Sequence, residues 1–183
     1  MVSLKKKIPS WGILALVCLI VAGVLSVVSC ITDEPIALRA QEKAFAARQE
    51  AFALADEFVQ MELEDGCGVD ACYEAYKAGK LVGYVAQITV SGCQGPIEIQ
   101  AGFDLDGEIQ AISCGGQKFS ETSGLGAKVK EHAFRDQFSG LAVPVALGET
   151  IDAVTGATIS STAVVDGVNA AGDFVGSLLC PSV

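Results

Sequence analysis

Apolar and polar positions along the chain predict one membrane-spanning helix followed by a mixed helix and strand domain. The first apolar run is the longest: no residue is charged between Lys7 and Asp33, and Trp11 to Cys30 consists mostly of Leu, Val, Ile, Ala and Gly. A helix of about 20 apolar residues crosses the roughly 30 Å hydrocarbon core of a bilayer. The run is therefore long enough to form an uncleaved membrane anchor.

The end of this run admits a second interpretation. Val27-Val28-Ser29-Cys30 resembles a bacterial lipobox, in which a signal peptide is cut before a cysteine that then receives lipid. The apolar part of a signal peptide usually spans about 7–15 residues, and this run is longer, which favours the uncleaved anchor. Both interpretations place the rest of the chain on the same side of the membrane.

A helical pattern continues after the anchor. Neither Gly nor Pro occurs from Ile36 to Met61, and the acidic residues before Pro35 are typical of a helix start. We therefore expect a connecting helix within residues 33–66 that ends before Gly66 and Gly68. Apolar residues recur every seven positions along it and would share one helical face: Leu38, Phe45, Phe52 and Val59. This face either packs on the domain, which is the favoured interpretation, or contacts a membrane partner.

Alternation with a period of two begins near residue 81 and predicts β-structure. Ile97, Ile99, Ala101 and Phe103 alternate with more polar or smaller residues, as in a half-buried strand. Asp106-Gly107 is a typical hairpin turn. We expect strands over residues 83–90, 97–103 and 108–114, joined as an antiparallel meander.

The remaining pattern alternates between short helices and one strand. Residues 128–138 are expected to form a helix that buries Val129, Ala133 and Phe134, and residues 143–147 an edge strand around Pro144. A final helix is expected over residues 160–179, with one apolar face made of Val164, Val168, Ala171, Val175 and Leu178. The predicted fold class is α+β: a transmembrane helix, then a small antiparallel sheet packed with helices.

Composition and charge agree with a membrane-anchored acidic domain. The chain has 183 residues, 51% of them hydrophobic, and a net charge of −10; its mean hydropathy is +0.46 and its pI about 4.4. This hydrophobicity excludes a disordered chain, and the acidity argues against a nucleic-acid partner. Lys5, Lys6 and Lys7 precede the apolar run, so the positive-inside rule predicts a cytoplasmic N-terminus and an extracytoplasmic chain from about Asp33.

The seven cysteines suggest no metal centre. Cys67 and Cys72 could form a disulfide in an oxidising exterior, although free or buried thiols are at least as well supported. A metal site is disfavoured because the ligand-like spacing occurs once and the single histidine, His132, lies far along the chain.

Two glycine-containing loops remain as candidates for chemistry, because the chain shows no hydrolytic triad, P-loop or Rossmann fingerprint. Residues 120–126 form one polar loop after the predicted sheet, and residues 152–158 form a second that runs directly into the last helix. Small residues let a backbone approach a ligand, and a threonine at a helix start either caps the helix or holds a phosphate.

Both loops resemble motifs of the FMN-binding family. Asp152-Ala153-Val154-Thr155-Gly156-Ala157-Thr158 matches that family's Asp-x-x-Ser/Thr-Gly-Ala-Thr motif, whose last threonine carries FMN through its phosphate. Glu121-Thr122-Ser123-Gly124-Leu125-Gly126 resembles the family's Glu-Thr-Pro-Gly-Leu-Gly loop, with Ser123 in the place of proline. The likeness covers about residues 81–175. With its single N-terminal helix, the chain is similar to the G subunits of Rnf-type complexes and is related to the C subunits of sodium-pumping NADH:quinone reductases.

This resemblance implies an extracytoplasmic FMN-binding domain over residues 67–183, after a cytoplasmic N-terminus and anchor over residues 1–32. FMN would be attached covalently to Thr158 by a flavin transferase. Leu125 would pack on the flavin ring, Thr122 and Thr155 would donate hydrogen bonds, and Lys128 would stabilise a negatively charged flavin. The implied cofactor-binding residues are Thr158, Asp152, Thr155, Gly156, Ala157, Glu121, Thr122, Gly124, Leu125, Gly126 and Lys128.

The implied function is electron relay, in a membrane complex that couples ferredoxin:NAD electron transfer to Na⁺ or H⁺ translocation. The chain would be a subunit that works with other membrane subunits, not an enzyme alone. Two alternatives stay open: a free-standing membrane-tethered flavoprotein, and a non-redox adaptor domain.

Overall fold

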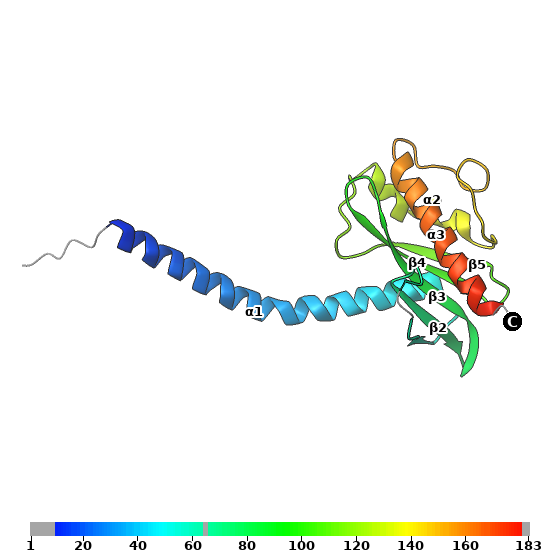
Figure 1. The fold of residues 1–183 in the computed structure, drawn as a ribbon, viewed down its shortest axis with the longest axis horizontal. Helices are drawn as coiled ribbons and strands as arrows, with labels where there is room; N and C mark the ends of the chain where they lie inside the picture. Colours follow the sequence, from blue (N-terminus) through cyan, green and yellow to red (C-terminus); the bar gives the residue numbers. More distant parts are fainter. Residues whose placement is uncertain (1–9, 64–65, 181–183) are drawn as a thin grey trace, which may run out of the picture. The chain divides into compact units, whose positions relative to one another are not determined.

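The computed structural model describes residues 10–63 and 66–180, with the backbone alone at residue 10 and residues 30–38. The predicted α+β class is confirmed, because a long N-terminal helix precedes an antiparallel sheet that is packed with helices (Figure 1). The longer elements are α1 (Ser10–Ala51), β1 (Glu57–Gln60), β2 (Ala71–Lys77), β3 (Lys80–Ser91), β4 (Pro96–Asp104), β5 (Ile109–Gly115) and α3 (Thr158–Leu179).

The chain divides into two compact units between Glu42 and Lys43. The first unit contains the apolar part of α1. Its segment Trp11–Ser29 has a mean hydropathy of 2.7 and no buried residue, so it is long and apolar enough to cross a membrane. The lysines at positions 5–7 lie outside the described residues, as do the side chains of Cys30 and Leu38.

The anchor and the predicted connecting helix form one continuous helix, α1, which ends earlier than expected. It continues without a break through Asp33-Glu34-Pro35, and it ends at Ala51 instead of near Met61. The next residue, Phe52, is buried against Ala75 and Val85 of the sheet, and the chain then extends into β1. The seven-residue repeat therefore does not form one helical face: Phe45 lies on α1, Phe52 follows it, and Val59 belongs to a strand.

The sheet has five strands in the order β1-β2-β3-β4-β5, all antiparallel. The predicted meander corresponds to β3, β4 and β5, and Gly107 has a positive φ of 84° in the hairpin turn between β4 and β5. Strands β1 and β2 were not predicted. β2 joins β3 through Ala78 and Gly79, which both have positive φ; alanine is unusual in that conformation, so the usual Asn-Gly or Asp-Gly signal of a hairpin is absent there.

Helix α3 packs across β3 and β4 and forms the main core with them (Figure 1). The apolar residues predicted to face the core from β4 are buried there: Ile97, Ile99, Ala101 and Phe103. The strand is not half-buried as expected, because Gln100 and Gly102 between them are also buried. Gly167 of α3 permits the close approach, since a Cβ atom there would lie only 2.7 Å from Ile99 Cδ1. The opposite face of the sheet is covered by Ala51 and Phe52, next to Gly102.

The segment between β5 and α3 is more irregular than expected. Instead of one helix over residues 128–138, it forms η1 (Gly126–Lys130), α2 (His132–Arg135) and η2 (Asp136–Phe138). Val129 and Phe134 are buried as predicted, but Ala133 is exposed.

Residues 143–147 form no strand. Asn169 of α3 pairs with both backbone groups of Val145, at 2.8 Å each, so this segment needs no strand partner to satisfy them. Isolated bridges occur just before this segment, at Ala142, and at its last residue, Leu147. The helix that follows, α3, begins at Thr158, two residues before its predicted start.

Candidate functional site

The two candidate loops meet at the N-terminal end of α3. Together with the turn between β3 and β4 they surround a cleft of about 430 Å³. The loop over residues 120–126 forms one wall and residues 156–160 form another. The cleft is lined by Cys93, Gln94, Glu121, Thr122, Leu125, Gly126, Gly156, Ala157, Thr158, Ile159 and Ser160.

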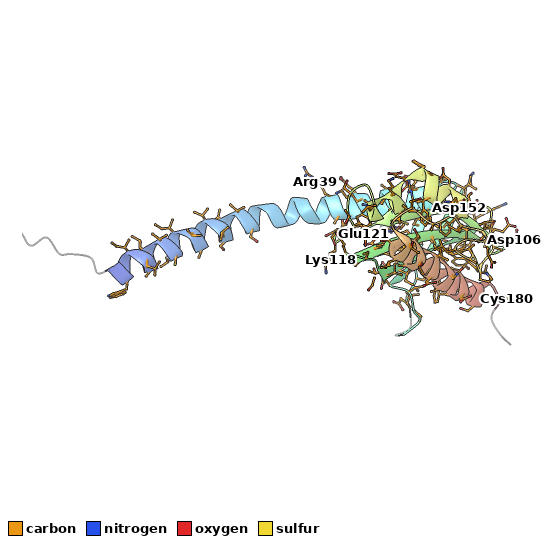
Figure 2. The ribbon with its side chains drawn as sticks, turned by 90° about the horizontal axis from the view of Figure 1, so that it is seen from above. Arg39, Asp106, Lys118, Glu121, Asp152 and Cys180 are labelled. Carbon is orange, nitrogen blue, oxygen red and sulfur yellow. The ribbon has the colours of Figure 1, made fainter. Side chains whose placement is uncertain are left out.

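Glu121 holds these three segments together. One carboxylate oxygen, Oε1, accepts a hydrogen bond from the backbone N–H of Gln94 at 3.0 Å. The other, Oε2, accepts one from the hydroxyl of Ser160 at 3.0 Å. The residue is only 8% exposed, and Figure 2 shows it beside the beginning of α3, with Asp106 and Cys180 at the other end of that helix. The shape of the cleft therefore depends on this side chain.

Two glycines make room for the Glu121 carboxylate. A Cβ atom on Gly126 would overlap Oε2 of Glu121, and a Cβ atom on Gly92 would overlap Oε1. Gly126, the last residue of the family-like loop, must therefore be glycine because it contacts Glu121, the first residue of the same loop. Gly156 acts differently: its φ of 78° turns the second loop toward Leu125.

Thr158 is the first residue of α3 and its side chain is exposed. The N-cap position belongs to Ala157, and no side chain caps the helix. The capping interpretation of Thr158 is therefore wrong: Ser161 provides the local side-chain contact instead, accepting a hydrogen bond from the Val154 N–H at 3.0 Å. Among the described residues no hydrogen bond engages the Thr158 hydroxyl, which lies at the positive end of the helix dipole.

A second hollow adjoins Thr158 on its other side. It encloses about 470 Å³ and its lining is mostly apolar. Thr158 and Ile159 belong to both hollows, so a group attached to Thr158 has space in either direction. The second hollow is lined by Val90, Ser91, Thr158, Ile159, Thr162, Ala163 and Asp166.

Four of the expected site residues do not line this cleft. Asp152, Thr155 and Lys128 line a separate hollow of about 470 Å³ beside α2. The backbone N–H of Asp152 donates to Gln137 Oε1 at 2.7 Å, and its side chain is exposed. Gly124 lies at the exposed tip of its loop with a φ of 81°.

The turn between β3 and β4 also belongs to the site, although its residues are not part of either predicted motif. Its residues Cys93 and Gln94 line the cleft with the two loops. Gly92 and Gly95 flank them between two predicted strands, and that glycine pair is the signal that could have indicated a ligand-facing turn.

The cysteines of the domain are all free thiols in the described structure, so Cys67 and Cys72 do not form a disulfide there. Burial raises the pKa of Cys72 to about 12. The part of the chain that the structure describes also contains no group of three or more His, Cys, Asp or Glu residues placed to hold a metal ion.

Comparison with known proteins agrees with this arrangement. Residues 92–173 match the FMN-binding domain family, and this range includes both loops and Thr158. The resemblance drawn from the two motifs is thereby confirmed, and FMN is supported as the ligand of this domain.

Curated relatives extend the likeness. The chain is 40% identical over 120 residues to the G subunit of the ion-translocating oxidoreductase complex of Methanosarcina acetivorans, covering 61% of this chain and 62% of that protein. It is 38% identical over 102 residues to the G subunit of the Na(+)-translocating ferredoxin:NAD(+) oxidoreductase complex of Acetobacterium woodii, covering 50% and 48%. The matches thus span about half to three fifths of these relatives.

A solved structure shares the fold. The C subunit of the Na(+)-translocating NADH-quinone reductase from Parabacteroides distasonis superposes with a TM-score of 0.50 at 19% identity, covering 62% of this chain and 64% of that one. At this identity the likeness shows the fold alone.

Proposed function

We propose that this chain, whose residues 92–173 match the FMN-binding domain family, is the electron-relaying flavoprotein subunit of a membrane complex of the Rnf type. Such a complex couples electron transfer between ferredoxin and NAD to Na⁺ or H⁺ translocation, and its other membrane subunits are the proposed partners. The observation that carries the proposal is the cleft in which the two family-like loops meet beside the exposed Thr158 hydroxyl. The names of the curated relatives support the type of complex.

FMN is proposed to be attached to Thr158 by a phosphoester. The exposed hydroxyl is accessible to a flavin transferase, and the uncapped start of α3 favours a phosphate through its N–H groups and dipole. A bond to the phosphate leaves the flavin ring free, and the bound cofactor supplies the redox chemistry. Covalent attachment also prevents loss of a cofactor outside the cell.

The protein's own side chains would position the ring. Leu125 is 47% exposed and Ile159 is 62% exposed. Both line the cleft together with Thr158, so they offer apolar surface to a planar ring. Glu121 would keep Thr122, Gly126 and Ala157 in place around it.

Asp152, Thr155 and Lys128 are proposed to act from their own hollow. Asp152 and Thr155 lie on the loop that leads to Thr158, where Asp152 is exposed and Thr155 lines the hollow beside it. Their place outside the cleft suits recognition by the transferase during attachment better than direct contact with the ring. Gly124 and Gly156 both have positive φ, and they would give the two loops the shape that FMN binding requires.

The domain is proposed to be extracytoplasmic from about Asp33, and the N-terminal segment cytoplasmic. The lysines at positions 5–7 before the apolar run support this orientation. The apolar segment Trp11–Ser29 of α1 would be the single membrane anchor.

The substitution Thr158→Val tests the attachment site. It removes the hydroxyl and nearly keeps the shape of the side chain. Because that hydroxyl caps nothing in the structure, the stability change should stay within about 0.5 kcal/mol. The full chain, produced together with its flavin transferase, should carry one FMN by intact mass and fluoresce in a denaturing gel. Thr158→Val should do neither.

The matched control is Thr162→Val, one helical turn later on α3 and on the lining of the hollow that Thr158 also borders. It should retain the flavin through denaturation. Flavin that survives denaturation on the Thr158 variant would contradict the assigned residue. An unmodified mass of the wild-type chain would contradict covalent attachment itself. Co-purification with polytopic membrane subunits separates a member of a complex from a free-standing flavoprotein.

A further inference from the structure

A further hollow of about 490 Å³ lies on the opposite face of the sheet, between the last turns of α1 and strands β4 and β5. It shares no lining residue with the cleft at Thr158. Its volume is within the range of small-molecule sites. The lining residues are Lys43, Ala46, Ala47, Glu50, Glu98, Gln100, Ser113, Cys114, Gly115 and Gly116.

Gln100 is a buried amide without a partner in this hollow. Its side chain is 2% exposed, and neither Oε1 nor Nε2 has a hydrogen-bond partner. The only other buried side-chain atom without a partner in the described part of the chain is Nε of Arg135. Arg135 itself contacts Glu50, which lines the same hollow. Arg135 does not line this hollow, but Gln100 does; since buried polar groups are normally paired, its free amide indicates a place built to receive a polar group.

The neighbouring charges are already engaged or balanced. Arg135 Nη1 lies 2.6 Å from Glu50 Oε1, and the hydroxyl of Ser113 donates to Glu50 Oε2 at 2.7 Å. Lys43 and Glu98, of opposite sign, remain on the lining. A ligand that carries a strong net charge would therefore be repelled by one of them, and a neutral ligand fits the hollow better.

The walls of the hollow favour a flat molecule. Lys43 and Glu50 also line it from α1, but Ala46 and Ala47 between them are small, and Gly115 and Gly116 line it from the end of β5, so these four positions leave room for a flat molecule. The Gln100 amide presents one acceptor and one donor group side by side. Its complement is a group that also carries a donor next to an acceptor, such as an amide or imide edge.

We propose that this hollow binds a small, neutral, planar molecule whose amide or imide edge pairs with Gln100. The inference is independent of the proposed function, because it uses other residues on another face of the sheet.

Uracil serves as the probe, because it is neutral and planar and carries such edges. Its matched control is 1,3-dimethyluracil, which keeps the ring and the carbonyl groups but has no N–H donor. Titration of the full-length protein in detergent, followed by saturation-transfer NMR, should show uracil binding at least about tenfold tighter than the dimethylated analogue.

Gln100→Met should lower the affinity for uracil by about tenfold or more, because it removes both polar atoms from a side chain of similar length. Its melting temperature should not fall, since the amide it replaces has no partner in the protein. Ala47→Leu should block binding by filling the hollow, and Gln60→Met on the exposed edge strand β1 should leave binding unchanged.

The proposal fails on any of three results. These are equal affinity for the two ligands, uracil binding to Gln100→Met as to the wild type, or no saturable binding of uracil by the wild type. The last result would mean that the hollow holds water only.

Discussion

Glu121 is the single residue on which the geometry of the cleft most depends. It accepts hydrogen bonds from the β3–β4 turn and from α3, and it excludes side chains at Gly92 and Gly126. Glu121→Ala would leave the fully buried Ser160 hydroxyl without its acceptor, and such a loss costs about 1–3 kcal/mol. We expect that decrease in the free energy of unfolding, measured by urea denaturation of the full chain, together with weaker flavin attachment.

Glu121→Gln is the matched variant. Its amide oxygen can still accept from Gln94, and its NH₂ group can donate to the hydroxyl oxygen of Ser160. We expect it to lose less than about 1 kcal/mol. A loss as large as that of the alanine variant would show that the negative charge matters, and not the pair of hydrogen bonds.

The role of Glu121 also shows the limit of residue-level prediction. Its presence among the site residues came from the family resemblance, but the sequence does not reveal that its carboxylate reaches Gln94 and Ser160, which lie 27 and 39 positions away along the chain. Conversely, Asp152, Thr155 and Lys128 belong to the predicted site yet line another hollow. Proximity along the chain did not decide which side chains share a cavity.

At the scale of elements, Glu50 connects the last turn of α1 to β5 and α2 through its contacts with Ser113 and Arg135. Burial raises the pKa of its carboxyl, but the hydrogen bond from Ser113 and the hydrogen bond and charge of Arg135 outweigh this effect, so the pKa lies below its usual value of 4.5. The ionised form therefore stabilises the folded state above pH 4.5. This stabilisation is lost as the pH falls through the lowered pKa of the folded state.

Glu50→Gln tests this contact. Its destabilisation relative to the wild type should be fully present at about pH 7 and should shrink as the pH falls below 4.5 and through the lowered pKa of the folded state. Urea denaturation at a series of pH values measures the difference, and Glu149→Gln, an exposed glutamate, is the control. A difference that does not change with pH would mean that Glu50 acts through packing and not through its charge.

The sequence predicted β3, β4, β5 and α3, but it missed β1 and β2 and predicted a strand over residues 143–147 that does not form. The period-two pattern identified β4 correctly, because its alternate apolar residues are all buried in the core under α3. The end of α1 was misplaced by about ten residues, since its Ala- and Glu-rich composition favours a helix well beyond Ala51. The helix ends where Phe52 is buried against β2 and β3. That contact joins residues far apart in the chain, so the local sequence pattern does not predict it.

At the scale of the whole molecule, the proposed orientation in the membrane rests on the charges beside the apolar segment and can be tested directly. If the N-terminal segment is cytoplasmic, as proposed from the three lysines, protease added to sealed right-side-out vesicles should digest the domain and leave that segment protected. Vesicles of inverted orientation are the control, and in them the domain should be protected. The opposite pattern would contradict the proposed orientation.

From hydropathy and motifs alone, the sequence predicts an apolar segment long enough to span a membrane, the α+β fold class and the resemblance to the FMN-binding family. It does so because these properties depend on the kinds and spacing of residues that are near one another in the chain. Tertiary structure alone decided that the two loops and the β3–β4 turn form one cleft, and that Thr158 is exposed and caps nothing. It also placed Gln100 without a partner on the opposite face. These features arise when segments distant in the sequence pack across a sheet, and only the folded chain brings their atoms together.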